Sequence, residues 1–89
     1  MGEMLTSIKI LPSDVEVDLE KLRENVRRIL PPTVKLFKVA EEPIAFGLTA
    51  LIAHIITSED ESDIIERVED LLKSLKDVGE VQIINMTRL

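Results

Sequence analysis

The chain has 89 residues, of which 45% are hydrophobic and only 2% aromatic, and its net charge is −6. This length predicts one domain, residues 1–89, with a single aliphatic core. The acidic balance argues against direct contact with nucleic acid, and no apolar run approaches the roughly 20 residues of a membrane span. The lack of cysteines excludes disulfides and thiolate metal sites. Because a membrane span and a signal-peptide pattern are both absent, we expect a cytoplasmic protein.

The first element expected is a strand over residues 4–11. Its side chains alternate between two faces, and one of these faces is formed by Thr6, Ile8 and Ile10. Pro12 ends the alternation, because proline lacks the N–H group that a sheet ladder needs.

A helix is expected next, with Asp18 as its N-cap, because a carboxylate there accepts backbone N–H groups and suits the positive end of the helix dipole. The pair Pro31-Pro32 ends this helix. Its apolar residues recur at spacings of three and four, and they are Leu19, Leu22, Val26 and Ile29.

Two further strands are expected over residues 33–40 and 48–57. Lys35 and Lys38 fall in the first of them, which suits an edge strand that must avoid pairing with other chains. The second is apolar on both faces, which is typical of a central strand that is covered on both sides. Its two faces are Leu48, Ala50, Ile52, His54 and Ile56 on one side and Leu51, Ala53 and Ile55 on the other.

The connector between these strands, residues 41–48, is predicted to be a hinge between two similar halves of the chain. Connectors are usually polar, and Glu41, Glu42 and Pro43 follow that rule, whereas the apolar run 44–46 does not. Apolar residues in a turn either fold back onto the core or contact a partner.

A second helix is expected from the acidic segment 58–61 to Lys76. The segment has the form of a capping box, with Asp60 and Ser62 as rival caps. The apolar stripe of the helix consists of Ile64, Val68, Leu71, Leu72 and Leu75.

Gly79 fits the turn out of this helix, and residues 80–89 form the last strand. The order β-α-β-β-α-β predicts an α+β, ferredoxin-like sandwich, with a four-stranded antiparallel sheet and two helices on one face. Right-handed crossovers place the first and third strands in the centre and the second and fourth at the edges.

Enzymatic chemistry finds no support in the sequence. The one histidine, His54, is expected to be partly buried with a backbone or water partner, since nothing with nucleophile or ligand spacing accompanies it. The acidic run 59–63 lacks the alternating ligands and the glycine of a calcium loop, so we expect a solvated helix N-terminus, although an ion there stays open. We therefore expect no catalytic residue, cofactor, metal site or small-molecule substrate of its own.

Two features remain, the pair Phe46-Gly47 and Arg88 beside the C-terminal residue. From the residues alone, Phe46 either folds over the open end of the core or stays available to a partner. Arg88 is, on the same basis, an exposed residue near a terminus.

The hinge sequence Glu-Pro-Ile-Ala-Phe-Gly-Leu at 42–48, followed by an apolar strand, resembles the archaeal elongation factor 1-beta family. The resemblance covers the whole chain and includes Ile-Lys-Ile-Leu-Pro at 8–12 and Met-Thr-Arg-Leu at 86–89. It implies a guanine-nucleotide exchange factor that promotes GDP release from the GTPase elongation factor 1-alpha during polypeptide elongation. The partner would be bound in its GDP-bound and nucleotide-free states, without covalent chemistry.

The resemblance also implies roles for single residues. In the eukaryotic relatives an aromatic residue before this glycine docks on the GTPase, and a penultimate lysine reaches the magnesium and γ-phosphate region. Phe46 would then be the docking anchor, and Arg88 would stand in place of the lysine, with a planar fork that is larger and more weakly hydrated than an ammonium group. The partner-binding residues expected on this basis are Pro43, Ile44, Ala45, Phe46, Gly47, Arg88 and Leu89.

A different class of function is also compatible with the sequence. A ferredoxin-like regulatory module would homodimerise and bind a small metabolite, using the aliphatic residues expected on the sheet face opposite the helices. This alternative predicts a stable homodimer and a ligand that raises the melting temperature. A nucleic-acid-binding module of the same topology is disfavoured by the acidic charge and the scarcity of aromatic residues.

Overall fold

The computed structural model describes residues 2–61 and 63–89. Its elements follow the order β-α-β-β-α-β, as the sequence predicts. They are β1 (Glu3–Pro12), α1 (Leu19–Ile29), β2 (Lys35–Ala45), β3 (Leu48–Ser58), α2 (Ile64–Lys73) and β4 (Val78–Arg88).

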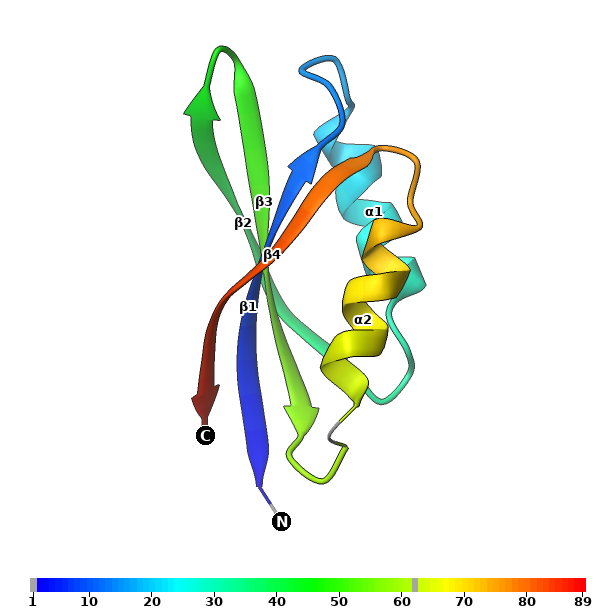
Figure 1. The fold of residues 1–89 in the computed structure, drawn as a ribbon, viewed down its shortest axis with the longest axis vertical. Coiled ribbons are helices and arrows are strands. Elements are labelled where there is room, and N and C mark those ends of the chain that lie inside the picture. Colours follow the sequence, from blue (N-terminus) through cyan, green and yellow to red (C-terminus); the bar gives the residue numbers. More distant parts are fainter. Residues whose placement is uncertain (1, 62) are drawn as a thin grey trace.

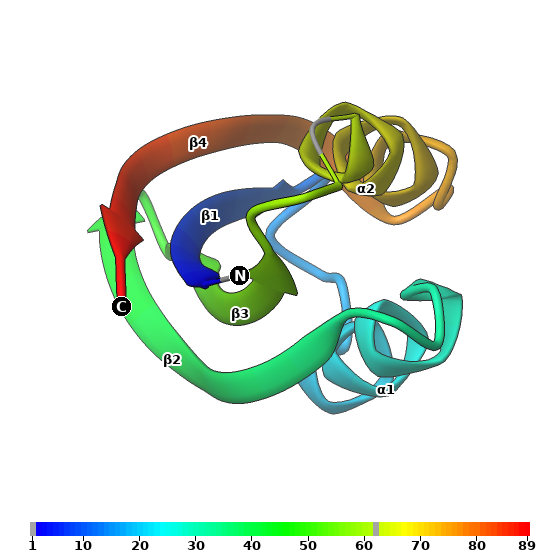
Figure 2. The same cartoon turned by 90° about the horizontal axis from the view of Figure 1, so that it is seen from below.

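The four strands form one sheet in the order β2-β3-β1-β4, and all neighbours are antiparallel. Both helices lie on the same side of this sheet, and the strands curl and twist strongly across it (Figures 1 and 2). The predicted ferredoxin-like arrangement is confirmed, with β1 and β3 central and the lysine-bearing β2 at an edge. Among the described residues, no helix has the length and apolar character needed to cross a membrane.

The core lies between the helices and one face of the sheet. The antiparallel register sets Ile8 opposite Ala53 and Ile10 opposite Leu51, so that these side chains share the face that the helices cover. They are fully or almost fully buried, together with residues from both helical stripes and from β4. The core cluster consists of Ile8, Ile10, Leu22, Val26, Val34, Leu51, Ala53, Ile55, Ile64, Val68, Leu72 and Val81.

No helix covers the opposite face of the sheet, yet its centre is buried. Ala50 and Ile52 are 0% and 6% exposed there. Lys9 on β1 and Glu42 on β2 form an ion pair of 2.9 Å between Nζ and Oε1, which passes over β3 at the height of these two residues. The aliphatic part of the lysine side chain thus shields the apolar centre while its charged end stays paired.

Helix α1 begins as its sequence predicts. The Asp18 carboxylate accepts hydrogen bonds from the backbone N–H groups of Glu20 and Lys21, at 3.0 and 3.3 Å. Two of the otherwise unpaired N–H groups at the helix start are satisfied in this way.

The start of α2 differs from the prediction. The helix begins at Ile64, its N-cap is Asp63, and the cap side chain makes no hydrogen bond. The Ser58 hydroxyl instead accepts the N–H of Asp60 at 3.2 Å, which is a local turn bond, so the predicted capping box is wrong. Ser62, the other proposed cap, lies outside the described residues.

The last strand begins two residues earlier than predicted, at Val78, so Gly79 lies inside β4 and not in a turn. A Cβ atom on Gly79 would come within 3.0 Å of the carbonyl oxygen of Pro12 and 3.1 Å of the Cα atom of Ser13. The ladder shifts register beside this point, between Leu11 and Pro12. Glycine is therefore required at position 79, because the backbone of β4 passes close to Pro12 and Ser13 at the end of β1.

Candidate functional site

The predicted hinge is a tight β-hairpin. Strand β2 continues through Ala45, which pairs with Leu48, so only Phe46 and Gly47 form the turn. The expectation of a long connector over residues 41–48 is therefore wrong. Pro43 is tolerated in β2 because this strand lies at an edge, where one side of the backbone has no neighbouring strand.

Phe46 and Gly47 both adopt positive φ angles, 54° and 81°. Two-residue hairpins favour such a turn because its twist matches that of the flanking strands, and glycine suits the second position. Phe46 does not suit its position, since a positive φ costs an ordinary residue about 1–2 kcal/mol. Among the described residues, Phe46 is the one non-glycine residue in this region. A strained bulky residue at a turn is a feature often found at functional sites.

The Phe46 side chain is 98% exposed, so the ring does not fold back onto the core. Apolar surface next to Phe46 continues at Ile44, which is 39% exposed. Ile44 lies where the strand pairing shifts register, between Pro43 and Ala45. This shift is a bulge, which bends the strand and redirects its side chains. We call residues 43–47 the hairpin tip.

The other predicted site residues lie at the end of β4. Arg88 pairs in register with Met4, and the N–H of Leu89 donates to the carbonyl oxygen of Glu3 at 2.8 Å. The Arg88 side chain is 76% exposed, and its Nε atom forms an ion pair of 3.1 Å with Oε2 of Glu59. The chain end is thus held by backbone bonding, while the guanidinium group reaches the surface.

Arg88 lines a shallow depression of about 250 Å³ between the end of the sheet and the start of α2. Met4, Ile65 and Met86 give this depression apolar lining, and Glu59 and Glu61 add carboxylates. We call this region the C-terminal site. Glu59 lies in a turn far from Arg88 along the chain, so no local sequence pattern indicates that these two residues meet.

The structure does not bring the hairpin tip and the C-terminal site together. Figure 1 shows the β2–β3 turn at one end of the long axis and the C-terminus toward the other. Leu48 adjoins the turn, whereas Thr57 is in register with Met4 and through it with Arg88. Because a strand rises about 3.3 Å per residue, the two sites lie about 30 Å apart. The whole molecule measures 42 Å along its longest axis.

The lone histidine has a partner that sequence reasoning missed. The Ser7 hydroxyl and Nδ1 of His54 are 2.8 Å apart, on the sheet face opposite the helices. The expected backbone or water partner is therefore wrong, because neighbouring central strands place Ser7 directly beside His54. This hydrogen bond satisfies both groups on a partly buried surface.

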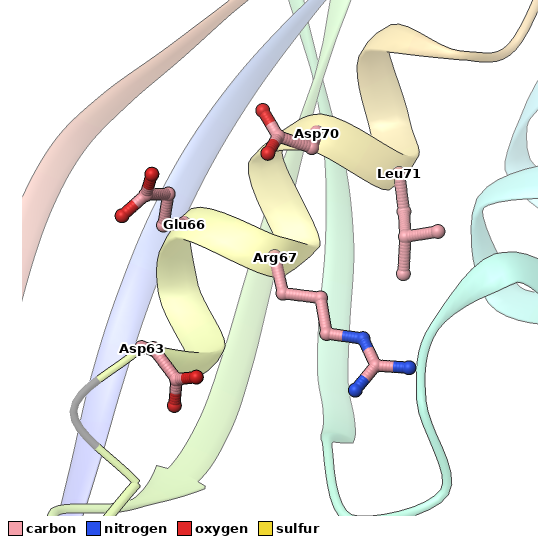
Figure 3. A pocket seen from close by; sticks show the side chains of 5 residues that line it. All are labelled: Asp63, Glu66, Arg67, Asp70 and Leu71. Carbon is pink, nitrogen blue, oxygen red and sulfur yellow. The ribbon is translucent and has the colours of Figure 1, made fainter.

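Two charged surfaces complete the description. A shallow space of about 450 Å³ on α2 is bordered by three carboxylates, and Figure 3 shows Glu66 and Asp70 pointing away from the side on which Arg67 and Leu71 lie. Among the residues that the structure describes, no group of acidic, histidine or cysteine side chains has the spacing to hold a metal ion. A groove beside β2 is basic instead, and Phe37 is exposed in it.

Comparison with known protein families shows to which family the chain belongs. The model of the EF-1 guanine nucleotide exchange domain matches residues 5–89, almost the entire chain. The chain belongs to this family. The hairpin tip lies within the matched range, and so do the residues of the C-terminal site apart from Met4.

Three relatives named elongation factor 1-beta align with this chain over almost their full lengths. A protein of Aeropyrum pernix named elongation factor 1-beta is 38% identical over 89 residues, covering 100% of this chain and 99% of the relative. The protein of the same name from Methanothermobacter thermautotrophicus is 34% identical with the same coverage. That of Sulfolobus acidocaldarius is also 34% identical and covers 98% and 97%. The predicted family is confirmed.

Solved structures that resemble the exchange domain show only its fold. The C-terminal domain of the MgtC protein from Mycobacterium tuberculosis superposes with a TM-score of 0.68 at 17% identity, covering 98% of this chain and 88% of that one. The ACT domain from GTP pyrophosphokinase of Chlorobium tepidum gives 0.70 at 14% identity, covering 94% and 89%. Such low identities carry no functional inference, because ferredoxin-like folds serve many functions.

Proposed function

We propose that this chain is a guanine-nucleotide exchange factor that promotes GDP release from elongation factor 1-alpha during polypeptide elongation. The observation that carries the proposal is the match of the exchange-domain model to residues 5–89, a range that includes the hairpin tip and Arg88. The proposal places the protein in the cytoplasm with its GTPase, and it requires no cofactor, metal or small-molecule substrate of its own.

An exchange factor makes and breaks no covalent bond. It accelerates GDP release by binding the nucleotide-free GTPase more tightly than the loaded GTPase, and each tenfold in nucleotide affinity requires about 1.4 kcal/mol of differential binding. The coupling is reciprocal, so GDP or GTP with Mg²⁺ must weaken the complex between this chain and the GTPase by the same factor.

The hairpin tip supplies the anchor in this proposal. Exposed aromatic rings often dominate binding energies once a partner buries them, and Phe46 offers nearly its whole ring. Because Phe46 sits on a two-residue turn between paired strands, its backbone is already fixed before binding. Little conformational entropy is then lost on docking, which favours affinity.

Arg88 supplies the disruptive contact. GTPases hold nucleotide through Mg²⁺ and a phosphate-cradling loop, so a cation brought to that site competes with the metal by charge repulsion. The exposure of the Arg88 side chain on a chain end held by backbone bonding supports this role. With the two sites about 30 Å apart, the ring and the guanidinium group would contact separate regions of the GTPase.

The proposal is tested by mixing the chain with archaeal elongation factor 1-alpha that carries fluorescent GDP, in the presence of Mg²⁺ and excess unlabelled nucleotide. We expect substoichiometric amounts of the chain to accelerate release, because an exchange factor turns over. An unchanged release rate with several cognate GTPases would overturn the proposal and favour the dimeric regulatory module.

A further inference from the structure

The C-terminal site contains an ion pair between the partly buried carboxylate of Glu59 and the exposed guanidinium group of Arg88. Glu59 contacts Arg88 through Nε, at 3.1 Å, and its own side chain is only 26% exposed, against 76% for Arg88. Among residues 2–61 and 63–89, no hydrogen bond or ion pair involves either terminal amino group of the guanidinium. The Glu59 carboxylate therefore pairs with Nε of Arg88, and the two terminal amino groups of the guanidinium remain available to a partner.

Both members of the pair are fixed through their backbones. The N–H of Glu59 donates to the carbonyl oxygen of Gly2 at 3.0 Å, and the Glu59 carboxylate packs so closely that a Cβ on Gly2 would lie 3.0–3.1 Å from its atoms. On the other side, Leu89 bonds to Glu3. The carboxylate is thus presented at a defined place at the end of the sheet, beneath the arginine.

Arginine and lysine would use such a carboxylate differently. A guanidinium group has three nitrogens, so an arginine whose Nε is ion-paired with Glu59 keeps two terminal amino groups for a partner. A lysine carries a single nitrogen, one bond further along the chain than Nε, and a carboxylate at this place would capture it. Arginine at position 88 therefore keeps terminal amino groups that face outward beside Glu59, whereas lysine would place its one charged nitrogen at the carboxylate.

We propose that Glu59 is a positioning residue for Arg88: it binds Nε and thereby presents the two terminal amino groups to the nucleotide site of the GTPase. This inference rests on the proposed exchange function and adds a residue to it. It also gives a physical reason for arginine at position 88 of this chain, where the resemblance implies lysine.

Four proteins test the inference: the unaltered chain, Glu59→Gln, Arg88→Lys and the double variant. The maximal rate of stimulated GDP release is measured for each at saturating concentration. In the arginine background, Glu59→Gln should lower this rate about twofold to fivefold, the range of an exposed ion pair. In the lysine background the same change should raise the rate by a similar factor, because it frees the ammonium group.

Glu66→Gln is the control. Glu66 carries the same charge and lies in the first turn of α2, outside the depression that Arg88 lines. Its substitution should change the maximal rate by less than about twofold in both backgrounds. A comparable effect of Glu66→Gln would show that the overall charge of the protein causes the change, and would overturn the specific role of Glu59.

A change of the same sign and size in both backgrounds would overturn the inference, because a merely structural role for Glu59 predicts that outcome. The proposed function would then stand, provided that the unaltered chain accelerates release. No acceleration by the unaltered chain would overturn the proposed function and this inference together. The free protein gives an independent measurement, since Glu59→Gln should shift the NMR resonance of the Arg88 Nε–H, and an unchanged resonance would contradict the ion pair.

Discussion

At one end of β3 the chain presents an apolar ring on a rigid turn, and at the other it presents a cation on a chain end. Phe46 has no neighbour from its own core, whereas Arg88 is paired with Glu59. The two ends also differ in what they offer a partner: the hairpin tip offers exposed apolar area that a partner could bury, and the C-terminal site offers positive charge. In the proposed function, the hairpin tip provides affinity for the GTPase and Arg88 displaces the nucleotide, so substitutions at the two ends should have separable effects.

The largest effect is expected from deletion of residues 88–89. Stimulated GDP release should fall to the spontaneous rate, because no cation would then reach the metal site, while binding to the nucleotide-free GTPase should be weakened but measurable. Stopped-flow release and a direct binding titration measure the two quantities separately. Thr87→Ala, which keeps Arg88 and Leu89 and their backbone pairing, is the control. Full exchange activity in the deletion variant would eliminate Arg88 as the displacing group.

Phe46→Ala should have the next largest effect. Loss of a hot-spot aromatic costs at least about 2 kcal/mol of binding, so the concentration for half-maximal stimulation should rise roughly 30-fold. The domain should stay folded, because the ring contributes nothing to the core. Titration of the release rate against the variant measures this concentration.

Phe37→Ala provides a matched control for the anchor. Phe37 is the other aromatic residue, it is 62% exposed, and it lies in β2 away from the turn. Its removal should leave half-maximal stimulation within about threefold of the unaltered chain. Equal effects of the two substitutions would show that the hairpin tip has no special place in binding.

A smaller effect is expected for Gly47→Ala. No heavy atom lies within 4 Å of an added Cβ, so the cost comes from the backbone at φ 81° and should be about 1–2 kcal/mol of folding free energy. The melting temperature should fall by roughly 4–8 °C for each kcal/mol. Because the turn also orients Phe46, half-maximal stimulation should shift to higher concentration, and an unchanged titration curve would show that ring orientation is unimportant.

Asp18→Ala should have the smallest effect on exchange. Loss of the N-cap of α1 should cost about 1 kcal/mol of stability, comparable to the turn substitution. The cap lies in neither candidate site, so GDP release should not change at temperatures where the variant is folded. Thermal unfolding and the release assay together check this, and reduced activity would indicate that stability alone explains the hairpin result.

Much of the fold could be predicted because its signals are local and periodic. The helical stripe from Leu19 to Ile29, the Asp18 cap and the two-faced apolar pattern of β3 all follow from spacing along the chain. The hairpin could not be delimited, because Glu41, Glu42 and Pro43 have the composition of a turn but pair as an edge strand. Strand preference depends on neighbours that the local sequence does not specify.

The candidate site was predictable only in part, for a related reason. Phe46 and Arg88 were singled out by type and position in a resembling family, and the structure exposes both. Their separation, and the contacts of Arg88 with Glu59 and of Ser7 with His54, depend on which strands and loops meet in space. Such pairs join residues far apart in the chain, so no local pattern indicates them.

Titration of the GDP release rate for the unaltered chain, Phe46→Ala and the deletion of residues 88–89 tests the central claim most directly. Two separable contacts predict that the unaltered chain accelerates release and that Phe46→Ala approaches the same maximal rate at high concentration. The deletion variant should stay at the spontaneous rate at every concentration. A deletion variant that reaches the full maximal rate, or an unaltered chain that leaves release unchanged, would contradict the account.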